Sequence, residues 1–216
     1  MEFFTVFRVR KSIKHFREDP AWAYRKRAPD YLASFEQDGY PFSLGPRGNS
    51  IRHIFQGTIQ GRPVSLFHHT ARKSGGGSPG ANETWNDYSV AVVTLPRALP
   101  ATAFTSGTFI SETEKGKRRA IPVSAGTYQD RPGGGPLDAV RRQSVDPDFA
   151  VLIDTKQVHQ LTRRAHLGWR IDGDRIIGWT RGRQPFDEIQ GMADTLIAIV
   201  GAFPEQTWHW PETTGG

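Results

Sequence analysis

The sequence of 216 residues contains no cysteine. Disulfide bonds, zinc sites built on thiolates and cysteine nucleophiles are therefore excluded. The sequence also lacks a run of about 18 apolar residues, the length that a membrane-spanning helix needs. Arg8 and Arg10 interrupt the apolar start that a secretory signal would require. These absences predict a cytoplasmic protein.

The motifs that would announce a cofactor are missing as well. The sequence has no HExxH pair of zinc ligands, and its glycine-rich segments 73–81 and 132–136 lack the Gly-Lys-Ser/Thr of a phosphate-binding Walker loop. Asp172 and Asp174 flank a glycine, which is typical of a turn rather than of an acid–base pair. The sequence therefore predicts no cofactor and no metal, and it favours a protein that is not an enzyme.

Acidic residues are outnumbered by basic ones. The chain has 28 Lys and Arg against 22 Asp and Glu, which gives a formal net charge of +6. Residues 1–17 hold five basic residues and one acidic residue, so much of the excess lies at one end. A charge of this sign favours anionic partners such as phosphates, nucleic acid or acidic lipid headgroups.

Residues 3–16 have the pattern of an amphipathic helix. Apolar side chains recur near helical spacing, and basic residues fill the other face. This composition is typical of a helix that lies in a membrane interface, and it is equally that of a helix whose aromatic side chains join the core. Both interpretations fit the pattern. The residues predicted to contact a membrane or a partner are Phe3, Phe7, Arg8, Lys11, Lys14 and Phe16.

Strand signals dominate the middle of the chain. A second helical patch, residues 20–39, contains Pro29 and should break there. Segments 51–58, 64–69 and 88–95 then show the alternation or apolar density of strands. The last of these is apolar on both of its faces, which predicts a central strand that is covered on both sides.

The last third of the sequence predicts a strand, a helix, a hairpin and a second helix. Asp146-Pro147 gives the cap and first residue of the helix, which carries Phe149, Leu152, Ile153, Leu161 and Ala165. Asp172-Gly173-Asp174 has the composition of a type I′ turn, and helical periodicity runs from Pro185 to Phe203.

The predicted fold class is therefore α+β: a central antiparallel sheet with a C-terminal strand-helix-hairpin-helix unit and an N-terminal helical arm. The predicted division is an arm at residues 1–40, an α+β domain at residues 41–210 with an internal hinge at 129–136, and a flexible tail at 211–216.

This order of elements resembles a group of uncharacterised conserved proteins of high-GC Gram-positive (actinobacterial) bacteria. The residues that carry the resemblance are Pro41-Phe42 with Gly45, Gly57-x-x-x-Gly61-Arg62, Asp146-Pro147-x-Phe149-Ala150 and Gly173-Asp174. The resemblance covers about residues 31–210 and implies no known activity. Members of that group often begin with a membrane-spanning or strongly apolar segment, whereas this chain begins with its basic amphipathic segment.

Histidines and tryptophans suggest two alternatives to a plain interaction protein. His53, His68 and His69 are ligand types, but strand periodicity places His68 and His69 on opposite faces, so at most one can join a given site. Completion by Asp87 or Glu83 would point to a metal-dependent hydrolase. Trp169 and Trp179, each close to an arginine, suggest stacking on nucleic-acid bases.

The sequence thus predicts a non-enzymatic interaction protein whose contact is an unknown protein or an anionic membrane surface at the inner face of the membrane. Nucleic-acid binding is the first alternative, and metal-dependent hydrolysis is the remotest.

Overall fold

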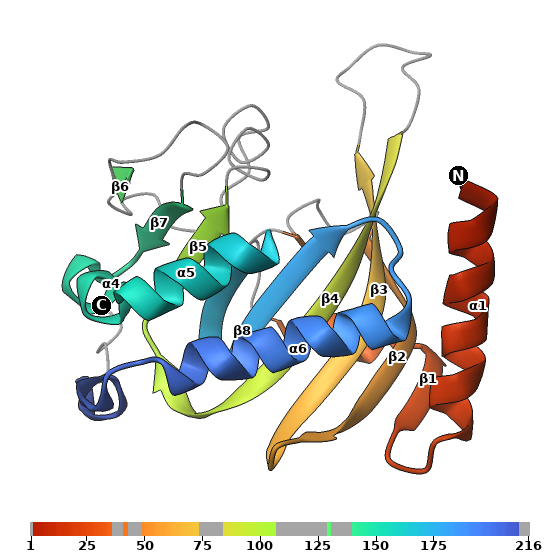
Figure 1. Cartoon of the computed structure of the whole chain (residues 1–216), viewed down its shortest axis with the longest axis horizontal. Coiled ribbons are helices and arrows are strands. Elements are labelled where there is room, and N and C mark those ends of the chain that lie inside the picture. Colours follow the sequence, from red (N-terminus) through yellow and green to blue (C-terminus); the bar gives the residue numbers. More distant parts are fainter. Residues whose placement is uncertain are drawn as a thin grey trace.

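The computed structural model describes residues 2–35, 41–42, 49–73, 84–106, 129–130 and 140–211 (Figure 1). The helices are α1 (Glu2–Glu18), α2 (Pro29–Ala33), α4 (Pro147–Ile153), α5 (Lys156–Ala165), α6 (Phe186–Gly201) and the 3-10 helix η1 (Glu205–His209). The strands are β1 (Ala23–Arg27), β2 (Asn49–Ile59), β3 (Arg62–Lys73), β4 (Thr84–Leu99), β5 (Thr102–Ser106), β6 (Gln129–Asp130), β7 (Val140–Ser144) and β8 (Gly168–Arg181).

All these strands join one antiparallel sheet in the order β1-β2-β3-β4-β8-β5-β7-β6. Helices and an antiparallel sheet together confirm the predicted α+β class. Helices α5 and α6 lie across one face of the sheet, and α1 stands at the β1–β2 edge (Figure 1).

Both faces of the sheet are buried because two apolar clusters sandwich it. Along β4, Ala91 and Val93 belong to the cluster under α6, whereas Val90 and Val92 belong to the cluster on the opposite face. That opposite cluster is completed by α2 and by segments that include Phe42. The predicted central strand, covered on both sides, is confirmed.

Strand β8 doubles back on itself. Its first part pairs with β5, and its second part pairs with β4 as far as Gly173. Gly168 lies against the ring of Trp179, 11 positions later in the strand. A straight strand of that length would span about 35 Å, so the contact requires a reversal near Gly173. The predicted hairpin is confirmed. The predicted type I′ turn is wrong, because it needs two residues with positive φ and Gly173 alone of the three turn residues has one.

The reversal of β8 places the ring of Trp179 so close to Gly168 that no side chain fits there. A Cβ atom there would lie 2.6 Å from Cζ2 of Trp179, whose ring is fully buried and cannot move aside. Gly168→Ala is therefore expected to lower the free energy of unfolding by about 1–3 kcal/mol, the usual cost of overpacking a core. Urea denaturation monitored by circular dichroism measures it. Gly191→Ala on α6 is the control, because a Cβ there meets nothing within 4 Å, and an equal loss in both variants would contradict the packing argument.

The C-terminal helices follow the predicted signals with one interruption. The Asp146 side chain accepts a hydrogen bond from the backbone N–H of Phe149 at 3.0 Å, as expected of the predicted cap. The helix then ends at Ile153, and the Thr155 hydroxyl caps α5 by accepting from the N–H of Val158 at 3.2 Å. The α6 helix confirms the predicted amphipathic helix, with its apolar face buried.

The N-terminal region needs one correction. Residues 23–27, predicted to be helical within the 20–39 patch, form the edge strand β1, which pairs with β2. Alternation of Trp22 and Tyr24 toward the core, with arginines and lysine outward, is a strand pattern that the helical interpretation overlooked. Of the predicted hinge, 129–130 form β6 and 131–136 lie outside the described residues, as do 212–216 of the predicted tail.

Candidate functional site

A cavity of about 540 Å³ opens between α1 and the neighbouring end of the sheet. Helix α1 forms one wall, and the opposite wall comes from β2, β3, β4 and the segment that leads into α6. The lining residues are Val6, Val9, Arg10, Ile13, His53, His68, Asp87 and Arg183.

A β-bulge points His53 into this cavity. The register of β2 against β3 shifts between Arg52 and Phe55, and His53 adopts φ 53°, which is uncommon for a residue with a side chain. The extra residue explains why Ile51 and Ile54, three positions apart, both join the cluster away from α6. The Tyr24 hydroxyl lies 2.9 Å from Nδ1 of His53 and holds the ring.

His68 lies beside His53, with 6.4 Å between the ring centroids. Its Nε2 donates to the carbonyl oxygen of Gln184 at 2.8 Å, since a carbonyl can only accept. Burial lowers the pKa of His68 to about 4. Burial also lowers the pKa of His53, and the cations Arg183, Lys26, Arg52 and Arg17 lower it further. Both imidazoles are therefore neutral at pH 7.

The carboxylate of Asp87 is tied into the opposite wall. Its Oδ2 lies 3.1 Å from Nε of Arg183, and its Oδ1 accepts from the Thr70 hydroxyl at 2.7 Å. Arg10 reaches the same cavity from α1, and no ion pair joins it to another described residue. The cavity therefore combines two guanidinium groups with one carboxylate.

The predicted split between His68 and His69 is confirmed. His68 contacts Phe186 at the start of α6, with ring centroids 4.7 Å apart, whereas His69 packs edge-on against Phe42 on the other face at 5.0 Å. Among the described residues no group of three or more histidine, cysteine, aspartate or glutamate side chains could hold a metal ion. Glu83 lies outside the described residues.

The predicted contact residues of α1 differ in how far they are exposed to solvent. Phe7 is 65% exposed and Lys11 is exposed, but Phe16 is only 4% exposed and packs on Phe55 and Phe186. Phe16 is therefore a core residue and not a surface contact. The side chain of Phe3 lies outside the described part of the structure.

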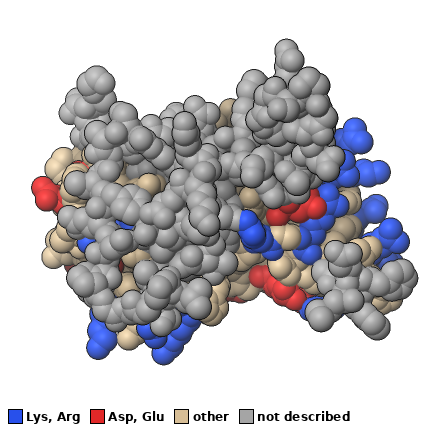
Figure 2. Space-filling view, turned by 90° about the horizontal axis from the view of Figure 1, so that it is seen from above, with Lys and Arg blue, Asp and Glu red and all other residues tan. Residues whose placement is uncertain are grey.

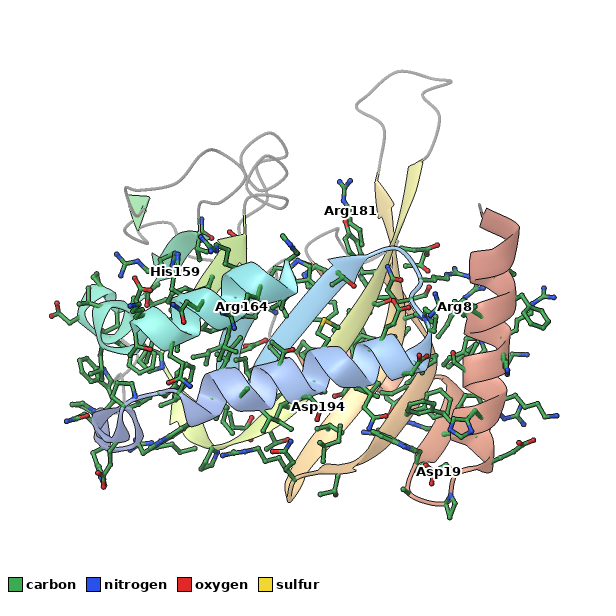
Figure 3. The ribbon with its side chains drawn as sticks, in the orientation of Figure 1. Arg8, Asp19, His159, Arg164, Arg181 and Asp194 are labelled. Atoms are coloured by element: carbon green, nitrogen blue, oxygen red, sulfur yellow. The ribbon has the colours of Figure 1, made fainter. Side chains whose placement is uncertain are left out.

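Two of the predicted contact cations on α1, Arg8 and Lys14, have carboxylates nearby. Arg8 lies on the side of α1 that faces the start of α6 (Figure 3), where its guanidinium is 2.8 Å from Glu188. Lys14 lies 3.8 Å from Glu18, one turn along the helix. Both pairs are exposed, so they restrain the side chains only weakly.

Further basic side chains lie beside α1 in the folded protein, although the sequence pattern did not predict them there. Strand β1 brings Arg25, Lys26 and Arg27 to the edge beside α1, all exposed, and Arg52 lies opposite Arg27 on β2. Figure 2 shows Lys and Arg side chains gathered at the end of the molecule that α1 occupies. The sequence did not predict that these cations lie beside α1, because their positions depend on the pairing of β1 with β2 in the sheet.

Trp169 and Trp179 are fully buried, one in each apolar cluster. Trp169 stacks on Phe104 at 4.5 Å and donates its Nε1–H to the Thr162 hydroxyl at 2.8 Å. Neither ring can stack on a nucleic-acid base, so both tryptophans serve the core.

No protein-family model matches the chain, and no curated protein matches it. One solved structure that is similar is the crystal structure of the mycobacterial trehalose monomycolate transport factor A, TtfA, with a TM-score of 0.59 and 10% sequence identity. The alignment covers 90% of this chain and 95% of that chain, and at this identity it shows a shared fold alone. Within the described residues, no helix combines the length and the apolar character that crossing a bilayer requires.

Proposed function

We propose that this protein is a non-enzymatic interaction protein that docks the exposed face of α1 on an anionic membrane surface. The observation that carries the proposal is Phe7, an aromatic side chain 65% exposed among cations. Phe7, Lys11 and Lys14 follow each other at four- and three-residue spacing, so they share one face of the helix. An apolar side chain ringed by basic ones is the pattern of an interfacial helix.

The expected binding is weak and reversible. Burying one phenylalanine side chain contributes about 1.5–3 kcal/mol, and each basic residue near an anionic surface adds about 1 kcal/mol. The electrostatic part should weaken with salt, because ions screen the field over about 8 Å at physiological ionic strength. Exposed Lys26 and Arg27 on β1 extend the same basic surface.

The test is co-sedimentation with liposomes of phosphatidylglycerol or of phosphatidylcholine at low and high salt. The protein should sediment with the anionic liposomes at low salt, and a triple variant, Phe7→Ser with Lys11→Gln and Lys14→Gln, should lose at least tenfold in binding. Deleting residues 1–17 would be a poor test, because it would remove Phe16 from the core.

A matched control makes the same kinds of substitution on a part of the surface away from α1. Val151 on α4 is 60% exposed, and Arg163 and Arg164 are exposed on α5, away from α1 (Figure 3). Val151→Ser with Arg163→Gln and Arg164→Gln should bind the anionic liposomes like the unchanged protein. Equal binding to both kinds of liposome, or none at low salt, would remove the membrane as the contact and leave a protein partner.

The fold comparison supports the same class of role. The similar structure is that of a protein named as a transport factor and comes from a mycobacterium, which agrees with membership of an actinobacterial family. We infer that this chain belongs to such a family and works at the inner face of the membrane. Nucleic-acid binding, the earlier alternative, has lost its two candidate stacking residues, Trp169 and Trp179.

A further inference from the structure

The cavity behind α1 has two chemically different walls. The helix contributes Val6, Val9 and Ile13, three apolar side chains along two turns, or about 10 Å of helix. The sheet side contributes two neutral imidazoles and the Asp87–Arg183 pair. A cavity of about 540 Å³ lies within the usual size of small-molecule sites, about 300–1,000 Å³, and such sites combine apolar walls with a few convergent polar groups.

Among the described charged side chains that line the cavity, one positive charge has no negatively charged partner. Asp87 neutralises Arg183, with which it is paired, and Arg10 from the opposite wall has no carboxylate partner among the described residues. Arg17, Lys26 and Arg52 add to the positive field at His53, where they oppose protonation of the ring. An anion entering the cavity would meet a guanidinium, which binds carboxylates well because it is planar and carries several N–H donors.

The geometry points to a binding site for a monocarboxylate that carries an aliphatic chain. Its carboxylate would lie between Arg10 and the His53–Arg183 wall, and its chain would follow Val6, Val9 and Ile13. The excess of one positive charge matches a single carboxylate, and the apolar wall removes the chain from water, which supplies most of the affinity. The site goes beyond membrane docking, because it uses the sheet-facing side of α1.

Three probes separate the two chemical requirements. Isothermal titration calorimetry on the full chain without lipid should detect saturable binding of decanoate, used below its micelle concentration. Decanol has the same chain without the charge, and acetate has the charge without the chain. Each should bind at least about tenfold more weakly, since a charge-assisted hydrogen bond and a buried aliphatic chain are each worth a factor of that order or more. The imidazole NMR signals of His53 should shift with decanoate.

Variants at exposed positions keep the fold intact. Arg10→Gln should weaken decanoate binding about tenfold or more, and Val6→Asn should weaken it several-fold. Arg164→Gln on α5 and Val151→Asn on α4 make the same changes at exposed positions outside the cavity and should leave the affinity unchanged. Circular dichroism melting verifies that all four variants are folded.

Several results would overturn the site. They are the absence of saturable decanoate binding, an unchanged affinity in folded Arg10→Gln, decanol binding as tightly as decanoate, and acetate binding as tightly as decanoate. The outcome is independent of membrane docking, because Phe7, Lys11 and Lys14 do not line the cavity. The triple variant that weakens liposome binding should bind decanoate normally.

Discussion

Replacing Leu196 by alanine is expected to lower the free energy of unfolding by about 2–5 kcal/mol, the range for truncating a buried leucine. Leu196 is fully buried on α6 and packs over Gly178 of β8. A Cβ at Gly178 would lie 3.0 Å from both methyl groups of Leu196, so the leucine fills the space that the glycine leaves. Gly178 has no side chain that could occupy the cavity left by the truncation, so the upper half of the range is expected.

Urea denaturation at pH 7 measures this loss. Val151→Ala is the control, because Val151 is 60% exposed and its truncation should change stability by less than about 0.5 kcal/mol. A loss of under about 0.5 kcal/mol for Leu196→Ala as well would mean that α6 does not pack on β8 as described.

Acid is expected to destabilise the fold between about pH 6.5 and pH 4. Burial lowers the pKa of His68 and of His69 from 6.5 to about 4, so the folded protein keeps both rings neutral while the unfolded chain takes up protons. Their contribution to stability is complete above pH 6.5 and is lost as the pH falls through the folded pKa near 4. Each histidine should account for a loss on the order of 3 kcal/mol across this window.

The measurement is the free energy of unfolding by urea at pH 7 and at pH 4.5. His69→Phe should reduce the pH dependence by about half, because phenylalanine keeps the packing against Phe42 and Tyr88 and removes one of the two buried titratable rings. Equal stability of the unchanged protein at the two pH values would contradict burial of both histidines. An unaltered pH dependence in folded His69→Phe would assign the effect to other groups.

Local signals in the sequence were enough to predict several elements correctly. The Asp146-Pro147 step caps α4 because a short acceptor side chain before proline satisfies a free backbone N–H wherever the helix lies. The α6 helix was readable from its apolar period, and the opposite faces of His68 and His69 from the two-residue period of a strand. The interruption at Asp154 was missed, because the apolar spacing continues across it.

Two sequence interpretations failed for a shared reason. Residues 23–27 gain their hydrogen bonds from β2, which lies more than 20 residues away, so local periodicity did not reveal the strand. Phe16 has the same side chain as Phe7, but it points about 180° around the helix from Phe7 and therefore enters the core. In both cases the outcome depends on what lies beside the segment in the folded protein.

Local patterns in the sequence were sufficient to predict the α+β class, the central buried strand, the hairpin, the C-terminal helices and the basic character of the N-terminal helix. Those features follow from periodicity, capping and turn residues, which act over a few positions. The tertiary structure alone decided that a bulge turns His53 toward His68, that Asp87 and Arg183 meet there, and that α1 closes a cavity over them. These groups come from α1, β2, β3, β4 and the segment before α6, and sheet register and helix docking bring them together.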